Sequence, residues 1–541
     1  MRLLRAASAI LAILVLSACS RVATQGGGVQ AAGNPWTVHG VLRIGGSQVP
    51  DNLNRMLGTL TVDEELASFW CARLFFIDDR EQLVPELALA EPTLANQGIS
   101  ADGRTITYHL RHGVVWQDGQ PFTAADVVFS WQQVMNPNNI VQSRTDYDSV
   151  AAIEAPDPYT AVVHMRKPYA PFTSMFFTSY CLIPKHILAG VSDINHAEYN
   201  RLPIGTGPFR VAAYEPGVFI KFVANKRYWR GPPKLREIDY HVVPSDTTLL
   251  TQVRTHELDF YHLASAEQAP EFGAIAGTVV YRYPFSTFND IGFNQSRPGV
   301  SDKRVRQALI YAIDVPQIIR VSTHGVFLRA DSDQPPWRWS HAATLKRYDY
   351  NPTLAARLLD AAGWRLGANG TRYKNGQPLQ LVMAGPTGSA TQNTAQIVMQ
   401  QEWRALGVDV SIKNYPNNVL YALGSGVEQS GKFDISYEGW TESIDPDQFQ
   451  LYGCALTPPA GWNVYHYCSP TLDQAEAIAR TSYDRAVRKR AYQRIQAAIV
   501  EDLPFYVLWF DQDQDVVNSD LRGYRPGKTN STFWNVWEWS I

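Results

Sequence analysis

The sequence predicts an α/β fold with mixed sheets, divided into more than one lobe. Segments with helical periodicity alternate with segments of strand character along most of the chain. The chain has 541 residues, of which 45% are hydrophobic and 18% are charged, so it can build sizeable cores and is too long for a single small module. Its 48 Lys+Arg and 51 Asp+Glu give a net charge of -3, and we therefore expect no nucleic acid partner.

Several elements are predicted by their caps and periodicity. A strand over residues 105–110 leads through a turn at Asp118-Gly119 into a helix capped by Thr123. A second strand is expected over residues 408–412, where buried and exposed positions alternate. Four further helices are expected to begin at Ser301-Asp302, at Asn351-Pro352, near Gln392 and near Asp484.

The first residues have the shape of an export signal. Arg2 and Arg5 precede an apolar run over residues 6–16 that is too short to span a membrane, and Leu16-Ser17-Ala18-Cys19 looks like a lipobox. We expect residues 1–18 to be removed, Cys19 to carry lipid such as palmitate, and residues 19–37 to form a flexible tether. The protein would then lie at the extracytoplasmic face of the cell membrane, held by the lipid anchor only. The alternative is an ordinary secretory signal that contains Cys19.

Four cysteines remain after Cys19, and an even number in an oxidising compartment favours disulfide bonds. Cys454 and Cys468 are fourteen residues apart across a loop that is easy to close, which would leave Cys71 to pair with Cys181. Four cysteines allow three connectivities, so this pairing is an expectation only. The alternative reading, a metal site, lacks a Cys-x-x-Cys motif.

No catalytic constellation is visible in the sequence. Residues 426–433 have the glycine and lysine spacing of a phosphate loop, but Phe433 stands where a hydroxyl must hold the magnesium ion. His256-Glu257 lacks the second histidine of a zinc protease helix, and Ser47 lacks the trailing glycine of a nucleophile elbow. We therefore expect no catalytic residue, no metal and no cofactor, and predict that the protein is not an enzyme.

Collinear segments between residues 40 and 541 resemble one family. Residues 103–137 closely resemble the signature segment of the solute-binding proteins that serve peptide and nickel ABC importers, known as family 5. Further blocks in the order of that family are residues 42–47, 203–209, 225–232, 291–294, 302–308, 348–363, 433–446 and 490–504. Gly439-Trp440-Thr441, followed by Asp445-Pro446-Asp447 and by Cys454 with Cys468, is similar to the dipeptide-permease type of the family.

The resemblance implies a two-lobed periplasmic-binding-protein fold of class II, the large peptide-binding type with an extra subdomain and a two-strand hinge. It implies a core of lobe I in residues 38–65, 199–287 and 513–541, the extra subdomain in residues 66–198, and lobe II in residues 288–512. It also implies a monomeric receptor that captures short peptides between its lobes. The receptor would deliver them to the transmembrane subunits of an ABC permease, with their ATPases.

The resemblance also nominates ligand-binding residues. An extended peptide would pair its backbone with two strand-like segments, Ser47, Gln48 and Val49 on one side and Gly439, Trp440 and Thr441 on the other. The carboxylate for the ligand ammonium would be Glu442 or Asp445, with Asp447 behind. The alternative for residues 445–447 is a turn or helix cap, and Trp440 is either a pocket wall or a core residue.

Two departures from the dipeptide-binding pattern keep other cargoes open. The segment between Thr441 and Asp445 is one residue short, and residues 383–394 contain no arginine for a ligand carboxylate. Longer peptides are therefore favoured over dipeptides as the cargo. The first alternative is the same receptor class with haem or another non-peptide cargo. The second alternative is an extracytoplasmic hydrolase of peptides or cell-wall fragments.

Overall fold

The computed structural model of the chain describes residues 33–529 and 531–541. Residues 38–541 form one compact unit. The predicted signal segment and the predicted lipidation at Cys19 lie outside the described residues. In the part of the chain that the structure describes, no helix combines the length and apolarity needed to cross a bilayer.

Eleven strands form the largest sheet, in the order β17-β16-β18-β11-β19-β10-β1-β9-β8-β7, with β12 paired to β19. Parallel and antiparallel pairs both occur, since β1 is parallel to β9 and β11 is antiparallel to β19, so the predicted mixed sheet is confirmed. The strands are β1 (Val41–Gly46), β7 (Phe209–Glu215), β8 (Phe219–Ala224), β9 (Glu237–Val242), β10 (Phe260–Tyr261), β11 (Thr278–Phe293), β12 (Leu328–Arg329), β16 (Gln380–Pro386), β17 (Asp409–Tyr415), β18 (Ile435–Thr441) and β19 (Phe505–Asn518).

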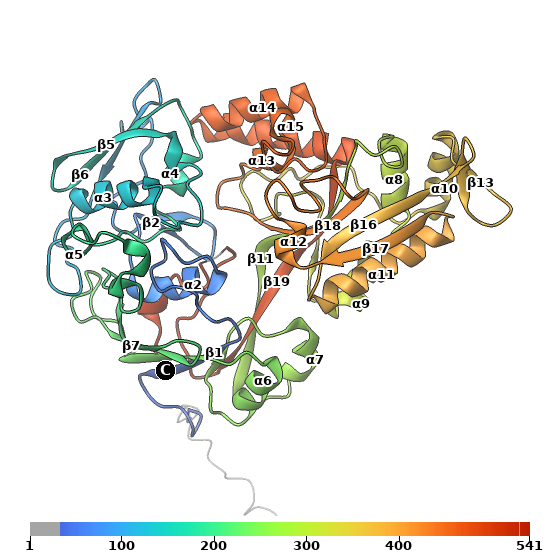
Figure 1. Cartoon of the computed structure of the whole chain (residues 1–541). Coiled ribbons are helices and arrows are strands. Elements are labelled where there is room, and N and C mark those ends of the chain that lie inside the picture. The colour runs from blue at the N-terminus through green and yellow to red at the C-terminus, as the bar shows by residue number, and fades with distance from the viewer. Residues whose placement is uncertain (1–32, 530) are drawn as a thin grey trace, which may run out of the picture. The chain divides into compact units, whose positions relative to one another are not determined.

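The two longest strands, β11 and β19, join the two halves of this sheet (Figure 1). At one end β19 pairs with β10, and at the other β11 pairs with β18. The register between β11 and β19 shifts between Pro284 and Phe288, which places a bulge where the strands pass from one half to the other. Proline cannot donate to a strand ladder, which fits its place at this bulge. The predicted two-strand hinge is therefore confirmed.

Lobe I, as the term is used below, contains β1 to β10 and the C-terminal residues 519–541. Its helix α3 begins after Thr123, whose backbone N–H donates to Asp126 at 2.9 Å, as the sequence predicts. Two small sheets, β2-β3 and β4-β6-β5, lie in this lobe. Its remaining elements are α2 (Thr61–Trp70), β2 (Phe75–Ile77), β3 (Leu83–Pro85), β4 (Thr105–His109), α3 (Ala124–Met135), β5 (Val150–Asp157), β6 (Thr160–Met165), α4 (Phe172–Met175), α5 (Lys185–Leu188), α6 (Asp246–Arg254) and α7 (Ala269–Phe272).

Lobe II contains α8 to α15 with β12 to β18. The four helices expected here are confirmed, and Asp302, Asn351, Ser389 and Asp484 cap them through side-chain oxygens. The elements are α8 (Lys303–Tyr311), α9 (Val315–Thr323), α10 (Pro352–Ala361), α11 (Ala390–Ala405), α12 (Asn417–Leu420), α13 (Phe449–Tyr452), α14 (Pro470–Thr481) and α15 (Arg485–Asp502), with a three-stranded sheet of β13 (Arg365–Leu366), β14 (Arg372–Lys374) and β15 (Gln377–Pro378).

Both expected disulfide bonds are present. Cys71 is bonded to Cys181 with 5.9 Å between their Cα atoms, and Cys454 is bonded to Cys468 with 4.5 Å. The first bond ties the end of α2 to a segment 110 residues away, and both of its residues are buried in the core of lobe I. Because the four sulfur atoms are bonded in pairs, they do not form the metal site that was the alternative.

Three carboxylates in the interior of lobe II have no arginine or lysine partner among residues 33–529 and 531–541. Asp290 on β11 is directly opposite Glu438 on β18, and Glu428 lies close to both. All three are at most 5% exposed, and neither oxygen of Glu428 has a hydrogen-bond partner. Burial raises the pKa of Glu438 to about 7, and burial together with the neighbouring carboxyl groups raises the pKa of Asp290 and of Glu428 well above their ordinary values.

Replacing Glu438 with Gln should remove a pH dependence of stability. A carboxyl group whose pKa is higher in the folded state stabilises the fold below its ordinary pKa of about 4.5, and this contribution is lost as pH rises through about 7. Chemical denaturation at pH 5 and pH 8 should therefore show the variant about 2 kcal/mol more stable than the parent at pH 8 and nearly equal at pH 5. The exposed control Glu267→Gln should show no such difference. A variant equally stable relative to the parent at both pH values would contradict the assignment.

Candidate functional site

Three cavities lie between lobe I and lobe II, and we call them cavities A, B and C. Their volumes are about 260, 300 and 710 Å³. Residues 441–445 of lobe II line all three, and residues 171–179 of lobe I also contribute to each. The segment 441–445 is therefore a partition between neighbouring chambers, and it includes three of the residues that the sequence nominates.

The end of β18 leads into this partition and has one open edge. Thr441, Trp440 and Gly439 are in register with Thr287, Phe288 and Asn289 of β11. On its other edge β18 pairs with β16 only at Ile435 and Ser436, so residues 437–441 have no strand partner there among the described residues. An open edge of this kind can pair with the backbone of an extended ligand.

Trp440 lies in the wall of cavity C and also packs against a hydrophobic core cluster of lobe II. Its ring is half-buried, and its indole N–H donates to the Gln448 side chain at 2.9 Å. Thr441 lines cavities B and C.

Ser47, Gln48 and Val49 lie elsewhere. They follow the end of β1, and Ser47 and Gln48 line a separate space of about 10 Å³ beside Glu65 and His262. Val49 is 42% exposed. The structure does not bring these three residues to the cavities that Gly439, Trp440 and Thr441 approach.

Glu442 is fully buried and already has partners. Its Oε1 accepts a hydrogen bond from the Gln334 side chain at 2.8 Å, and its Oε2 lies 3.1 Å from the Nη1 of Arg338. Burial raises the pKa of Glu442 well above its ordinary value, although Arg338 acts to lower it. Glu442 therefore needs the guanidinium to remain charged at this position.

The same arginine joins the two lobes. Arg338 is 1% exposed, and its Nη2 lies 3.4 Å from the Oε1 of Glu81 in lobe I. Glu81 sits between β2 and β3 in a left-handed conformation with φ of +56°, and it also accepts hydrogen bonds from Trp337 and Ser286, each at 3.2 Å. Ser286 belongs to the hinge bulge of β11, and its backbone accepts from Glu442 and donates to Lys528. This buried group, which we call the Arg338 latch, links the hinge to both lobes.

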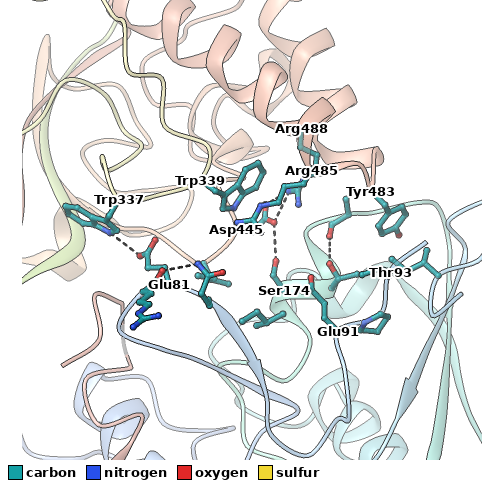
Figure 2. A pocket seen from close by; sticks show the side chains of 18 residues that line it. Glu81, Glu91, Thr93, Ser174, Trp337, Trp339, Asp445, Tyr483, Arg485 and Arg488 are labelled. Carbon is teal, nitrogen blue, oxygen red and sulfur yellow. Dashed lines mark hydrogen bonds and ion pairs between the residues drawn. The ribbon is translucent and has the colours of Figure 1, made fainter. Parts of the chain in front are cut away.

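Asp445 lies between cavities A and C and is also neutralised by an arginine. Its two oxygens are 2.7 and 2.8 Å from the Nη2 of Arg488, and Ser174 of lobe I donates its hydroxyl at 3.1 Å (Figure 2). Figure 2 also shows Trp339 beside Arg485 and Arg488, whose guanidinium carbons lie 5.0 and 5.5 Å from its ring centre. Asp445 thus contributes to an ion pair within lobe II and to a contact with lobe I.

Asp447 faces another carboxylate across the lobes. Arg480 donates to it at 2.8 Å, and the hydroxyl of Tyr169 lies 3.3 Å from the same oxygen and 2.5 Å from Asp146 of lobe I. Burial raises the pKa of Asp447, while Arg480 acts to lower it. Burial likewise raises the pKa of Asp146, to about 6, and the carboxylates of Asp447 and Asp445 add to this effect.

Sequence reasoning did not nominate several polar residues of the site. Glu81, Asp146 and Tyr169 lie in the predicted extra subdomain, and Arg338 lies in a loop of lobe II. None of them belongs to a motif, because each gains its role from a residue far away in the chain. The positive φ of Glu81 and Asp146, at +56° and +73°, is unusual for residues other than glycine but is visible only in the structure.

The middle of the chain, residues 82–461, matches a known protein family. The family model described as bacterial extracellular solute-binding proteins, family 5, middle, matches residues 82–461. The chain belongs to this family. The matched region contains the segments that enclose most of the three cavities, including residues 141–146, 169–179, 337–339 and 440–450.

Relatives cover nearly the whole chain. The oligopeptide-binding protein AppA of Bacillus subtilis is 26% identical over 95% of this chain and 94% of its own length. Protein XP55 of Streptomyces lividans is 29% identical over 90% of this chain and 87% of its own length. Among solved structures, the ABC transporter substrate-binding protein CtaP of Listeria monocytogenes superposes with a TM-score of 0.81 at 23% identity, covering 93% of this chain and all of that one. The last similarity confirms the fold.

The Arg338 latch predicts unequal effects for its members. Arg338→Met would leave Glu81 and Glu442 buried without their guanidinium, so its unfolding free energy should fall by about 3 to 5 kcal/mol in chemical denaturation. Glu81→Gln removes only the charge from lobe I and should cost about 1 to 2 kcal/mol. The half-exposed control Arg347→Met should stay within about 0.5 kcal/mol of the parent. Equal effects for Arg338→Met and Arg347→Met would show that no latch exists.

Proposed function

We propose that the chain is the extracytoplasmic substrate-binding lipoprotein of an ABC importer. It captures short peptides between its two lobes and delivers them to the permease subunits in the membrane. The observation that carries the proposal is the set of three cavities between the lobes, which share residues 441–445 as a wall. The names of the relatives, an oligopeptide-binding protein and an ABC transporter substrate-binding protein, agree with it.

The open edge of β18 supports a peptide as the ligand. Backbone groups of residues 439–441, which are exposed or half-buried, can pair with an extended peptide, and such pairing gives affinity without reading the peptide sequence. Cavities of about 260, 300 and 710 Å³ leave room for side chains of different size, with water filling the remainder. The receptor would therefore accept peptides of varied sequence.

Closure of the lobes couples binding to delivery. A ligand favours the closed form only if it contacts both lobes, because equal affinity for both forms shifts no equilibrium. In each cavity, residues 171–179 of lobe I face residues 441–445 of lobe II, so a ligand there contacts both. β11 and β19, with the bulge at residues 284–288, would form the hinge. Binding and release in this scheme require no catalytic step, and we propose a monomer without enzymatic activity.

The two carboxylates nominated to bind the ligand ammonium remain part of the proposal in a modified form. Glu442 and Asp445 are both ion-paired with arginine, so a ligand ammonium at either would share the carboxylate with a guanidinium. Ser47, Gln48 and Val49 would contact a ligand only in a more open arrangement of the lobes. Trp440 and Thr441 line cavity C, so a ligand there would meet them, and Gly439 precedes them in β18.

The lipid anchor completes the proposal. Residues 1–18 would be removed, Cys19 would carry the lipid, and residues 19–37 would connect it to the folded unit. An anchor keeps the receptor close to its permease, so a bound peptide would be delivered at a high effective concentration.

Peptides should raise the melting temperature of the purified protein. A ligand present at about 100 times its dissociation constant stabilises the native state by roughly 2.7 kcal/mol, which a thermal shift assay detects readily. Peptides of two to nine residues, haem and glutathione should be tested after native mass spectrometry of the protein as purified. If haem raises the melting temperature and no peptide does, the cargo is not a peptide. Release of amino acids from the peptides would overturn the receptor function itself.

Replacing Cys19 with Ser should release the protein from membranes. The parent should be found in the membrane fraction and incorporate labelled palmitate, whereas the variant should be soluble after export and unlabelled. The control variant Ser20→Ala should behave like the parent. A Cys19→Ser protein that remains in the membrane fraction would contradict the lipid anchor.

A further inference from the structure

Cavity C has the largest volume of the three and contains aromatic and acidic side chains from both lobes. Its volume is about 710 Å³. Lobe I contributes Asp146 and Tyr169, and lobe II contributes Trp440, Trp462 and other residues of the segments 440–450 and 462–480. A cavity of this size holds a side chain or a terminal group of a ligand with room for water.

The charges in the wall of cavity C do not balance. Asp445 is paired with Arg488, and Asp447 is paired with Arg480. Asp146 forms no ion pair with an arginine or lysine among the described residues, and its carboxylate accepts a hydrogen bond from the Tyr169 hydroxyl at 2.5 Å. One carboxylate of the cavity therefore lacks a positive partner.

Among the described residues, two indole rings in the same wall have no cation and no other aromatic ring against their faces. Arg480 lies between Tyr169 and Phe449, with its guanidinium carbon 5.3 and 4.8 Å from the two ring centres, so those rings already have a cation. Trp440 and Trp462 are half-buried, and no ring stacking or cation contact involves either of them in the part of the chain that the structure describes. Indole faces attract ammonium and guanidinium groups more strongly than other aromatic rings do.

We infer that cavity C is a subsite for a positively charged group of the ligand, with Asp146 as its counter-ion and Trp440 and Trp462 as its aromatic walls. The inference rests on the proposed function and narrows it, because it names the chemistry of the ligand. Asp146 belongs to lobe I and Trp440 to lobe II, so a cation in cavity C contacts both lobes. It therefore favours the closed form, in which Asp146 and Asp447 otherwise repel each other.

The cation can come from either of two groups of a peptide: its terminal ammonium, or a lysine or arginine side chain. Four peptides of one length and otherwise one sequence separate them: a free amino terminus with lysine, a free amino terminus with norleucine, an acetylated terminus with lysine, and an acetylated terminus with norleucine. Norleucine keeps the unbranched aliphatic side chain of lysine and removes the charge. Their dissociation constants are measured by isothermal titration calorimetry with the purified full-length protein at pH 7.5.

The acetylated norleucine peptide should bind about tenfold more weakly than at least one cationic peptide. Asp146→Asn should weaken the cationic peptides by about tenfold and leave the neutral peptide unchanged. The control Asp148→Asn removes an exposed carboxylate two residues away and should change neither. Whichever cationic peptide loses affinity in Asp146→Asn identifies the source of the cation.

The pH dependence gives a second measurement that a purely structural role of Asp146 would not affect. Since burial raises the pKa of Asp146 to about 6, the parent should bind cationic peptides more weakly at pH 5 than at pH 7.5, and Asp146→Asn should lose most of this difference. The other ionisable groups near Asp146 include Asp445, Asp447, Asp148, Tyr147, Tyr169 and Arg480. A lysine or arginine side chain remains charged throughout this range of pH, and a terminal ammonium, with a pKa of about 7.7 to 8.0, is still mostly charged at pH 7.5.

The outcomes separate the inference from the proposed function. If all four peptides bind equally, or if Asp146→Asn weakens them all equally, cavity C is not a cation subsite although the protein binds peptides. If none of the four binds the parent protein, the proposed function fails, and the inference fails with it. Should Asp146→Asn not fold, Trp440→Leu provides the same comparison, with cationic peptides weakened and the neutral peptide retained.

Discussion

Neutralising buried charge at the boundary between the lobes is the constraint on which the rest of the site depends. Arg338 is almost completely buried, and it lies against Glu442 of lobe II and Glu81 of lobe I. A buried guanidinium without partners would be far too costly, so the closed arrangement exists only because carboxylates from both lobes meet it. Ser286 connects the hinge to the same group. Its hydroxyl donates to Glu81, and its backbone bonds to Glu442, which follows β18, and to Lys528 of the C-terminal segment.

The same constraint shapes the cavities. Residues 441–447 carry three acidic side chains in seven positions, and each is paired with an arginine from another part of lobe II. With these charges neutralised, the segment can stand as a thin partition between three chambers without repelling itself. Asp146 is the exception in cavity C, because it lies in lobe I and no arginine of lobe II reaches it in ion-pair distance. The carboxylate that the protein leaves without an arginine partner is therefore the one available to a cationic ligand group.

The unusual content of aromatic residues, 12% with 15 Trp, has a partial explanation in the structure. In lobe I, Phe69, Phe260, Phe533 and Trp539 pack against one another, and Arg230 stacks on Trp229 and Trp537. These rings stabilise the lobe by burial and by edge-to-face contacts. Trp440 and Trp462 differ from them because they line a cavity. The sequence nominates Trp440 as a ligand contact, and no local pattern distinguishes Trp462.

By itself the sequence determined the helix starts at Asp302, Asn351 and Asp484, the capping box at Thr123 and the mixed α/β class, and it nominated the segment 439–447 for ligand binding. Those features are encoded by neighbouring residues, through caps, periodicity and contiguous motifs. Tertiary structure alone decided that Arg338, Arg480 and Arg488 neutralise Glu442, Asp447 and Asp445, that Ser47 lies away from the cavities, and that Asp146 faces Asp447. These pairings depend on distances across space between residues that are 33 or more positions apart in the chain, and no local pattern encodes such distances.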